Sequence, residues 1–337
     1  MFGNDRIPIV LLTGHLGSGK TTLLNDYLSA ADVEPALVII NEFGEVGLDH
    51  QLVRQTSENI ILLENGCICC TVRGDLVDTL KELHDDLRSG KLAPFKRVVI
   101  ETTGLADPVP VVHGMMNDFQ IMLAYELTSI VALVDAVNGC SVLERYPEAS
   151  RQVALADRVC ITKGDLADAG AIDRVQRAVA RINPSVDMTR RELGLMDRSL
   201  FERRFHSTTG VSDIEHWLGR AAGSAASLHG AGGAIRSTAI IRDRPVTWDT
   251  VSHWVDRLVA RYGPNLLRVK GILNIDGADR PSVLHGIQHL FHPPEELPCW
   301  PSSDHRTRIV CIVDGIAPEE IQALFAEAEA MPSPMGV

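Results

Sequence analysis

The chain has 337 residues, about twice the usual size of one domain, so two domains are expected. Its composition, with 45% hydrophobic and 23% charged residues, is that of a globular protein and excludes a chain that is disordered, collagen-like or coiled-coil throughout. The 32 Lys and Arg residues against 44 Asp and Glu residues give a net charge of −12, which argues against nonspecific binding of nucleic acid.

No stretch approaches the roughly 20 consecutive apolar residues that a membrane-spanning helix needs. The N-terminus has neither a basic leader nor a long apolar segment followed by a cleavage site. The seven cysteines are an odd number, and the chain is too large to depend on disulfides. We therefore expect a cytoplasmic protein without a membrane partner, in which clustered thiols serve metal or redox chemistry.

The first two thirds of the chain alternate apolar runs with helical patterns. The apolar runs, rich in Val, Ile and Leu, predict strands at 7–13, 36–40, 59–63, 97–100, 129–135 and 158–162. The helical patterns cover 20–30, 74–88 and 169–182. This alternation predicts an α/β fold with a mostly parallel sheet and helices on both faces.

The last third has a different composition and pattern. A segment rich in Gly, Ala and Ser, 219–235, predicts a flexible linker between a domain at 1–218 and a smaller one at 236–337. Beyond it we expect a strand at 237–241, a helix at 247–262, strands at 266–275, 282–291 and 307–313, and a helix at 319–330. This order predicts a small α+β domain.

A phosphate-binding loop follows the first predicted strand. The segment Gly14–Thr21 matches G-x-x-x-x-G-K-T, and a helical pattern follows it. Backbone N–H groups of such a loop, with the N-terminus of the helix, bind phosphates, while Lys20 reaches the β- and γ-phosphates and Thr21 ligates Mg²⁺. The residues expected to contact the nucleotide here are Gly14, His15, Leu16, Gly17, Ser18, Gly19, Lys20, Thr21 and Thr22.

A carboxylate ends the strand predicted at 97–100. In a parallel sheet Glu101 would lie at the same edge as the phosphate loop. We expect Glu101 to hold Mg²⁺ through water and Gly104 to offer its N–H to the γ-phosphate. The alternative is a glutamate at a strand end that faces solvent.

A candidate base-recognition segment, Thr162-Lys163-Gly164-Asp165, follows the strand at 158–162. Guanine presents an N1–H and an exocyclic amine side by side, and one carboxylate can accept from both, whereas adenine has no such pair. Asp165 suits that role, with the Lys163 stem packed on the base. Thr162 stands where Asn is usual and has only one hydroxyl; an ordinary surface turn is the alternative.

Three cysteines, Cys67, Cys69 and Cys70, lie within four positions beside a glycine. Three thiolates suit a soft divalent ion such as zinc and leave one tetrahedral position open. Water, an exchanging donor or a side chain such as Glu42, Glu64 or His113 would fill it, and Glu42 is included among the expected metal residues. The alternatives are a thiol redox switch and buried cysteines that serve only packing.

The other cysteines and the C-terminal histidines favour structural roles. Cys140, Cys160, Cys299 and Cys311 stand alone in apolar or proline-rich surroundings. On one regular strand His285 and His289 would be about 13 Å apart, too far to share an ion without a bulge. These two and His292 are interpreted mainly as sheet residues.

Together the motifs resemble the CobW-type GTPases, relatives of the hydrogenase and urease maturation GTPases. The residues that carry the resemblance, which covers nearly the whole chain, are 13–22 (TGHLGSGKTT), 41–49 (NEFGEVGLD), 64–70 (ENGCICC), 101–108 (ETTGLADP), 162–166 (TKGDL), 267–272 (LRVKGI) and 285–293 (HGIQHLFHP).

The resemblance implies a P-loop fold, GTP hydrolysis with Mg²⁺, and a transition metal, often zinc or cobalt, at the three-cysteine motif. It also implies that 41–47 is a switch segment, in which Glu42 and Glu45 could meet both metal ions and couple their affinities. The histidine-rich run of many members is missing from this chain.

The leading hypothesis is a slow GTPase that delivers a divalent metal to a client metalloprotein or cofactor-synthesis enzyme, with GTP and GDP as its ligands and a homo-oligomer as a possible assembly. The alternatives are a nucleotide-gated metal or thiol-redox sensor that regulates a partner, and an ATP-dependent kinase.

Overall fold

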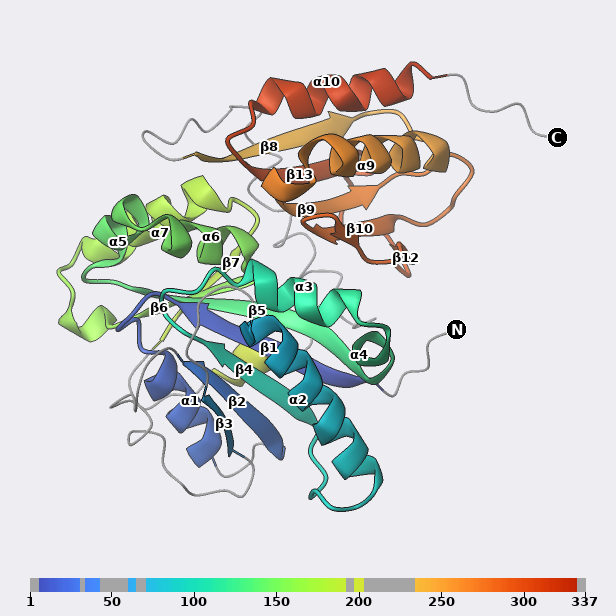
Figure 1. Ribbon diagram of the computed structural model, residues 1–337. Helices are drawn as coiled ribbons and strands as arrows, with labels where there is room; N and C mark the ends of the chain where they lie inside the picture. Colours follow the sequence, from blue (N-terminus) through green and yellow to red (C-terminus); the bar gives the residue numbers. More distant parts are fainter. Residues whose placement is uncertain are drawn as a thin grey trace. The chain divides into compact units, whose positions relative to one another are not determined.

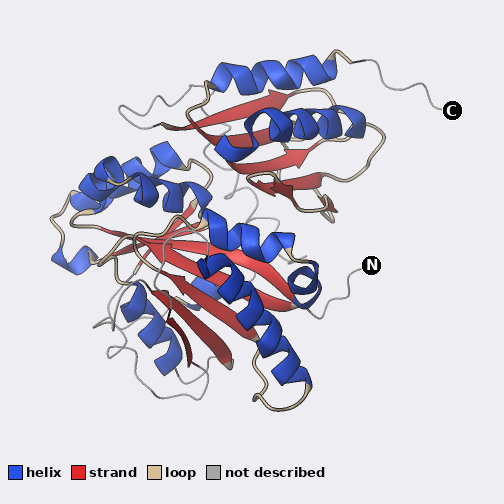
Figure 2. Ribbon diagram, in the orientation of Figure 1, coloured by secondary structure: helices blue, strands red, loops and turns tan. Residues whose placement is uncertain are grey.

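The computed structural model describes residues 6–30, 34–42, 60–64, 71–191, 197–202 and 234–331. The described chain falls into two compact units. The first carries a seven-stranded sheet and the second a six-stranded sheet (Figures 1 and 2). The expected α/β class with a smaller C-terminal α+β part is confirmed, whereas the domain limits at 218 and 236 stay a prediction, since 203–233 lie outside the described residues.

The first sheet contains every strand predicted before residue 163 and one more. Its order is β3-β2-β4-β1-β5-β6-β7. The strands are β1 (Ile7–Gly14), β2 (Ala36–Glu42), β3 (Ile60–Glu64), β4 (Arg97–Thr102), β5 (Tyr125–Asp135), β6 (Arg158–Thr162) and β7 (Asp187–Arg190). β7 is short and polar, Asp-Met-Thr-Arg, and therefore lacks the apolar run by which the others are predicted.

The pairings among β1 to β6 are parallel, so the carboxyl ends of these strands meet at one edge of the sheet. The register aligns Leu12 of β1 with Glu101 of β4, which confirms that the strand carrying the phosphate loop and the strand carrying the carboxylate are neighbours. At the same edge Asp135 of β5 aligns with Thr162 of β6. Among the described residues, this edge therefore holds the phosphate loop, Glu101 and Thr162.

Seven α-helices are described in the first two thirds of the chain. They are α1 (Lys20–Ser29), α2 (Thr71–Arg88), α3 (Val109–Asn117), α4 (Phe119–Ala124), α5 (Gly139–Arg145), α6 (Pro147–Leu155) and α7 (Ala171–Ile182), with short 3₁₀ turns at Gly164–Leu166 and Arg198–Phe201. The three helices expected from periodicity, α1, α2 and α7, are confirmed. α3 to α6 span only six to nine residues, less than the window in which a helical period can be recognised.

Both faces of the first sheet are buried. Val10 and Leu12 of β1 belong to a core that includes Leu23 and Tyr27 of α1. Ile9, Leu11 and Thr13 alternate with them on β1, point to the opposite face and are equally buried. Burial on both faces explains why these strands are continuous apolar runs in the sequence.

None of the described helices is long and apolar enough to cross a lipid bilayer.

The second sheet is antiparallel, with the order β11-β10-β9-β13-β8 and β12 beside β10. Its strands are β8 (Ile235–Arg242), β9 (Leu266–Leu273), β10 (Ser282–Ile287), β11 (Leu290–Phe291), β12 (Glu295–Glu296) and β13 (Thr307–Asp314). Helices α9 (Trp248–Tyr262) and α10 (Pro318–Glu329) contribute to one core with this sheet, in which Trp254 and Phe325 meet edge to face at 5.3 Å.

The strand expected at 282–291 is wrong as a single element. It is two short strands, β10 and β11, that form a tight antiparallel hairpin. Gln288 between them has φ of 52°, a left-handed backbone conformation that ends the first strand. The reversal brings the rings of His285 and His292 together at 4.9 Å in a parallel stack. His285 is a strand residue as expected, whereas His289 lies in the turn.

Candidate functional site

The phosphate loop joins β1 to α1 through residues whose backbone requires glycine. Gly17 and Gly19 have φ of 72° and 96°, and Gly19 is the N-cap of α1. A Cβ atom on Gly14 would lie 2.7 Å from both Leu133 O and Ser18 Oγ. Left-handed glycines turn successive N–H groups toward one side and allow close approach of the backbone to a ligand, which is the geometry that a phosphate needs.

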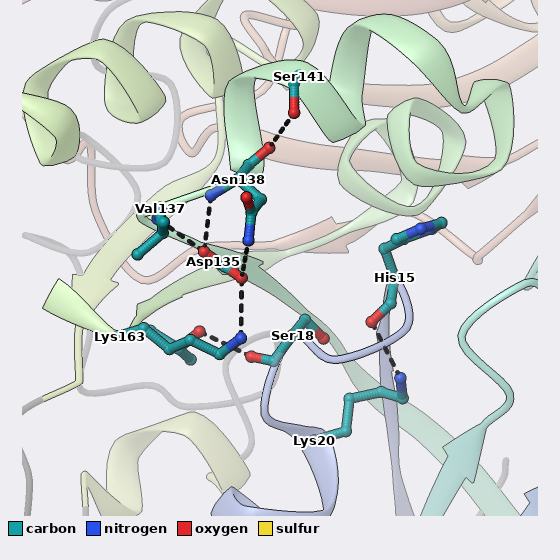
Figure 3. A network of polar contacts seen from close by, with 9 residues as sticks. His15, Ser18, Lys20, Asp135, Val137, Asn138, Ser141 and Lys163 are labelled. Atoms are coloured by element: carbon teal, nitrogen blue, oxygen red, sulfur yellow. Dashed lines mark hydrogen bonds and ion pairs between the residues drawn. The ribbon is translucent and has the colours of Figure 1, made fainter. Parts of the chain in front are cut away.

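The Lys20 ammonium folds back over the loop. Its Nζ donates to Gly14 O at 2.8 Å. It also donates to His15 O at 3.3 Å, a contact drawn in Figure 3. Lys20 is only 7% exposed, although it is the first residue of α1. A buried cation above the N-terminus of a helix makes the loop strongly attractive to anions, as the sequence predicts.

A hydroxyl of the phosphate loop provides a further indication of an anion site. Ser18 is 3% exposed, and within the described part of the chain its Oγ has no hydrogen-bond partner. A buried hydroxyl without a partner costs free energy, and a phosphate oxygen would satisfy it. Ser18 therefore fits the expected role in nucleotide binding.

Thr21 and Glu101 meet at the start of α1. The Thr21 hydroxyl lies 3.3 Å from Glu101 Oε1, and Glu101 is 5% exposed. A hydroxyl and a carboxylate side by side are the hard oxygen donors that Mg²⁺ prefers. The structure thus brings together the two residues expected to hold the metal and contradicts the alternative of a solvent-facing Glu101.

The segment after β4 lies directly against the phosphate loop. A Cβ atom on Gly104 would be 2.5 Å from Leu16 N, closer than any real side chain could lie. Only glycine allows this approach, so Gly104 is adjacent to the phosphate loop, where the sequence expects its N–H to meet a γ-phosphate.

Thr162 joins the base-recognition segment to the phosphate loop. Its hydroxyl donates to Ser18 O at 2.7 Å, and both residues are buried. The single hydroxyl that replaces the usual Asn side chain therefore fixes one loop against the other. The sequence alone did not predict this contact.

Lys163 is held by a residue that the sequence analysis did not select. Its Nζ lies 2.9 Å from Asp135 Oδ2, and its backbone has φ of 55° (Figure 3). Asp165 follows in an exposed 3₁₀ turn (Gly164–Leu166). The ion pair with Asp135 thus fixes the Lys163 ammonium, whereas Asp165 is exposed. A residue that accepts hydrogen bonds from a base must be accessible in this way.

Asp135 collects four donors at the end of β5. It accepts from Val137 N at 2.6 Å, Asn138 N at 2.9 Å and Asn138 Nδ2 at 3.3 Å, in addition to Lys163. Burial by itself would raise the pKa of Asp135, but the hydrogen bonds from Lys163 and from the two backbone amides outweigh it and hold the pKa below its ordinary value. Asp135 is therefore an ionised anchor for Lys163.

His15 stacks on an aromatic side chain beside the phosphate loop. Its ring lies 4.4 Å from that of Tyr146, at 30° between planes. Burial lowers the pKa of His15, and the charge of Lys20 lowers it further, against a smaller opposite effect of Glu148. These effects favour the neutral imidazole in the loop.

The three clustered cysteines, Cys67, Cys69 and Cys70, lie outside the described residues, as does 43–59, so their metal-binding role stays a prediction. The elements on either side are described. β3 ends at Glu64, α2 begins at Thr71, and β2 ends at Glu42, the register partner of Glu64. β3 therefore ends at the same sheet edge as β1, three strand spacings, or about 14 Å, away from it.

The other metal candidates are distributed as follows. His113, a possible fourth ligand, is half-buried on α3. Within the described ranges no group of three His, Cys, Asp or Glu side chains could hold a metal ion. Cys160 and Cys311 are buried, Cys140 is half-buried and Cys299 is exposed.

Three residues at the site were missed from sequence: Asp135, Tyr146 and Gln152. Asp135 ends an apolar strand at the carboxyl edge, the same signal by which Glu101 was found, and could have been selected by it. Gln152 of α6 donates to Gly104 O and Ala106 O, and a lone glutamine in a helix gives no such signal.

Comparison with known proteins agrees with this geometry. Residues 8–190 match the family model described as "CobW/HypB/UreG, nucleotide-binding domain", and residues 235–329 match "Cobalamin synthesis protein cobW C-terminal domain". The chain is 34% identical over 325 residues to the zinc chaperone YjiA of Escherichia coli, covering 95% of this chain and 98% of YjiA. It is 32% identical over 225 residues to the zinc chaperone CobW of Pseudomonas aeruginosa, covering 56% and 58% of the two chains.

A solved structure extends the likeness to the whole fold. The crystal structure of the Zn(II)-bound YjiA GTPase from E. coli superposes with a TM-score of 0.70 at 30% identity, covering 96% of this chain and 99% of that chain. The loop geometry, the strand order and the two matched domains confirm the resemblance found in the sequence: the chain belongs to the CobW/HypB/UreG family and carries both the nucleotide-binding domain and the CobW C-terminal domain.

Proposed function

We propose that this P-loop GTPase couples Mg²⁺-dependent hydrolysis of GTP to the binding of a divalent transition metal, zinc or alternatively cobalt, and to its delivery to a client protein or cofactor pathway. One observation carries the proposal. β2, which leads into the expected switch segment, is hydrogen-bonded on one side to β4, the strand of Glu101, and on the other to β3, the strand that precedes the cysteines.

The phosphate part of the site would act through position and charge. Backbone N–H groups of the loop bind the phosphates, Lys20 reaches the β- and γ-phosphates, and Thr21 and Glu101 hold Mg²⁺. When bound, Mg²⁺ neutralises the charge that develops on the phosphate oxygens during transfer. Gly104 offers its N–H to the γ-phosphate, which distinguishes GTP from GDP.

The base would be recognised at the end of β6. Asp165 accepts from N1–H and the exocyclic amine of guanine, and the Lys163 stem packs on the ring. The Asp135 carboxylate and the Thr162 hydroxyl support this assignment, since they fix Lys163 and the segment start before any base binds.

The transported metal would be held by Cys67, Cys69 and Cys70 with Glu42 as a further ligand. The donor set of three thiolates is that of a zinc site, and two relatives are named zinc chaperones. β2 pairs with β4, which carries Glu101, and with β3, which precedes the cysteines. A change in β2 on hydrolysis would therefore alter the affinities for the nucleotide and for this metal together.

The test is metal and nucleotide analysis of the purified chain. We expect one zinc per chain that survives gel filtration, and its loss when Cys67, Cys69 and Cys70 are all replaced by Ser. GTP should compete for the nucleotide site far better than ATP. Full zinc retention in the triple variant would place the metal elsewhere, and an ATP preference would favour the kinase alternative.

Delivery and sensing differ in the fate of the zinc. We expect transfer of zinc to a competing chelator to be faster in one nucleotide state than in the other. Equal transfer in the GTP-analogue and GDP states would contradict delivery and leave the metal or thiol-redox sensor as the better description.

A further inference from the structure

The segment Thr103–Asp107 between β4 and α3 is a short turn against the phosphate loop. Ala106 N donates to Thr103 O at 3.1 Å, which closes the turn, and Gly104 contacts Leu16. On the proposed function, the position of the Gly104 N–H determines whether it can donate a hydrogen bond to the γ-phosphate of GTP. Whatever fixes this turn therefore influences the affinity for GTP and leaves that for GDP largely unchanged.

Gln152 of α6 holds this turn by two hydrogen bonds from its side-chain amide. Its Nε2 donates to Gly104 O at 3.3 Å and to Ala106 O at 3.0 Å, and the residue is 1% exposed. Two carbonyl oxygens can be satisfied only by a group with two protons, so the amide nitrogen faces the turn. No ionised carboxylate of the same shape could replace it, because a carboxylate only accepts hydrogen bonds.

The neighbouring residue holds the other end of the turn. Arg151 Nη1 lies 3.0 Å from Asp107 Oδ2, and Asp107 Oδ1 accepts from Val109 N at the start of α3. This ion pair is partly exposed and therefore weak, whereas the Gln152 contacts are buried and therefore strong. Two successive side chains of α6 thus hold one turn, with the buried amide as the stronger element.

We propose that Gln152 is a positioning residue that orients the Gly104 turn for the γ-phosphate and passes the presence of that phosphate to α6. The inference rests on the proposed function. In this role Gln152 acts through the backbone of Gly104, whose carbonyl it holds.

The experiment compares Gln152→Glu with a matched control, Asn183→Asp. Asn183 is a second buried amide whose Nδ2 donates to two carbonyls of the same helix, Val153 O at 3.0 Å and Ala154 O at 3.3 Å. Both substitutions remove two donors from a buried site, but only Gln152 touches the Gly104 turn. Dissociation constants are measured for a non-hydrolysable GTP analogue and for GDP, together with kcat, KM and Tm.

We expect Gln152→Glu to weaken binding of the GTP analogue relative to GDP by about tenfold. Asn183→Asp should lower Tm and leave that ratio unchanged. An unchanged ratio in folded Gln152→Glu, or an equal change in both variants, would overturn the inference while wild-type GTP binding leaves the proposed function intact. If the wild-type chain does not bind GTP, the proposed function itself fails.

Hydrogen exchange on the wild-type protein tests the same inference without a substitution. Amides of 147–155 should exchange more slowly with the GTP analogue bound than with GDP. Equal exchange in the two states would contradict a path from the γ-phosphate to α6, even if Gln152→Glu fails to fold.

Discussion

The phosphate half of the site (Gly14–Thr22, Glu101 and Gly104) and the base half (Asp135 and Thr162–Asp165) each contain one lysine, and the two lysines are held differently. Lys20 donates to two neutral backbone carbonyls, whereas Lys163 is paired with the ionised carboxylate of Asp135. A phosphate is a stronger partner for an ammonium than a carbonyl is, so it can draw Lys20 to itself. Lys163 is paired with a carboxylate and serves as a fixed support.

On the proposed function, this difference gives the two halves separate roles. A phosphate would take Lys20 from these carbonyls, as catalysis requires, while the carboxylate and hydroxyl contacts keep the base half fixed, as recognition requires. The contact of Thr162 with Ser18 O joins the halves. Substitutions in each half, and at the joint, should therefore have separate consequences.

The largest effect is expected from Lys20→Ala. Loss of the ammonium that neutralises the β- and γ-phosphates should lower kcat for GTP by about a thousandfold or more. Turnover is measured by phosphate release, with Lys91→Ala as the control, since Lys91 is exposed and paired with Asp86. Unchanged turnover in Lys20→Ala would rule out the phosphate-loop assignment.

Asp165→Asn should affect the base half alone. An amide cannot accept from both guanine donors, so GTP should bind about a hundredfold more weakly while ATP binding stays the same. Competition binding with both nucleotides gives the ratio. Asp168→Asn is the control, since this exposed Asp is paired with Arg174 and lies three residues farther along. Preserved discrimination against ATP would mean that another residue reads the base.

Thr162→Val tests the contact between Thr162 and Ser18 that joins the two halves. Removing the hydroxyl leaves the buried Ser18 carbonyl without this donor, which should lower the free energy of unfolding by about 1 to 3 kcal/mol. Thr162→Ser keeps the hydroxyl and should lose less. Denaturant unfolding measures both variants, and a Val variant as stable as the Ser variant would show that the hydroxyl does not join the halves.

The smallest effect is expected at Asp135, and it depends on pH. The pKa of Asp135 is lower in the folded protein than its ordinary value of 3.8, so its stabilising contribution is present above 3.8 and is lost as the pH falls through the folded pKa. Asp135→Asn should cost about 1 kcal/mol at pH 7, a modest value because Lys163 is partly exposed.

The same difference in unfolding free energy should shrink as the pH falls below 3.8. Lys163→Met removes the ammonium, so adding Asp135→Asn to it should cost less than in the wild-type background. Equal costs in the two backgrounds would contradict the anchoring role.

Sequence reasoning succeeded where one residue's chemistry and its strand context agree. The proximity of Thr21 to Glu101 was predicted because a glycine-rich loop and a carboxylate both follow apolar strands, and parallel pairing brings such ends together. Six of the seven strands of the first sheet were predicted from their apolar runs, the pattern expected of a parallel sheet that is covered on both faces.

The sequence did not predict contacts between segments far apart in the chain. The pairing of Gln152 with the carbonyls of Gly104 and Ala106 depends on where α6 packs, and the helix is too short to show a period. The hairpin at 282–291 escaped detection because Gln288 adopts a left-handed backbone conformation without being Gly, Asn or Asp.

The central claim is that β2 lets a guanine nucleotide and a thiolate-held metal affect each other's binding. The most direct measurement is the zinc dissociation constant of the purified chain, by competition with a chelator, during titration with a non-hydrolysable GTP analogue and with GDP. We predict at least a fivefold difference between the two nucleotide states, and its loss with Lys20→Ala. Identical zinc affinity in both states, with nucleotide bound, would contradict the coupling.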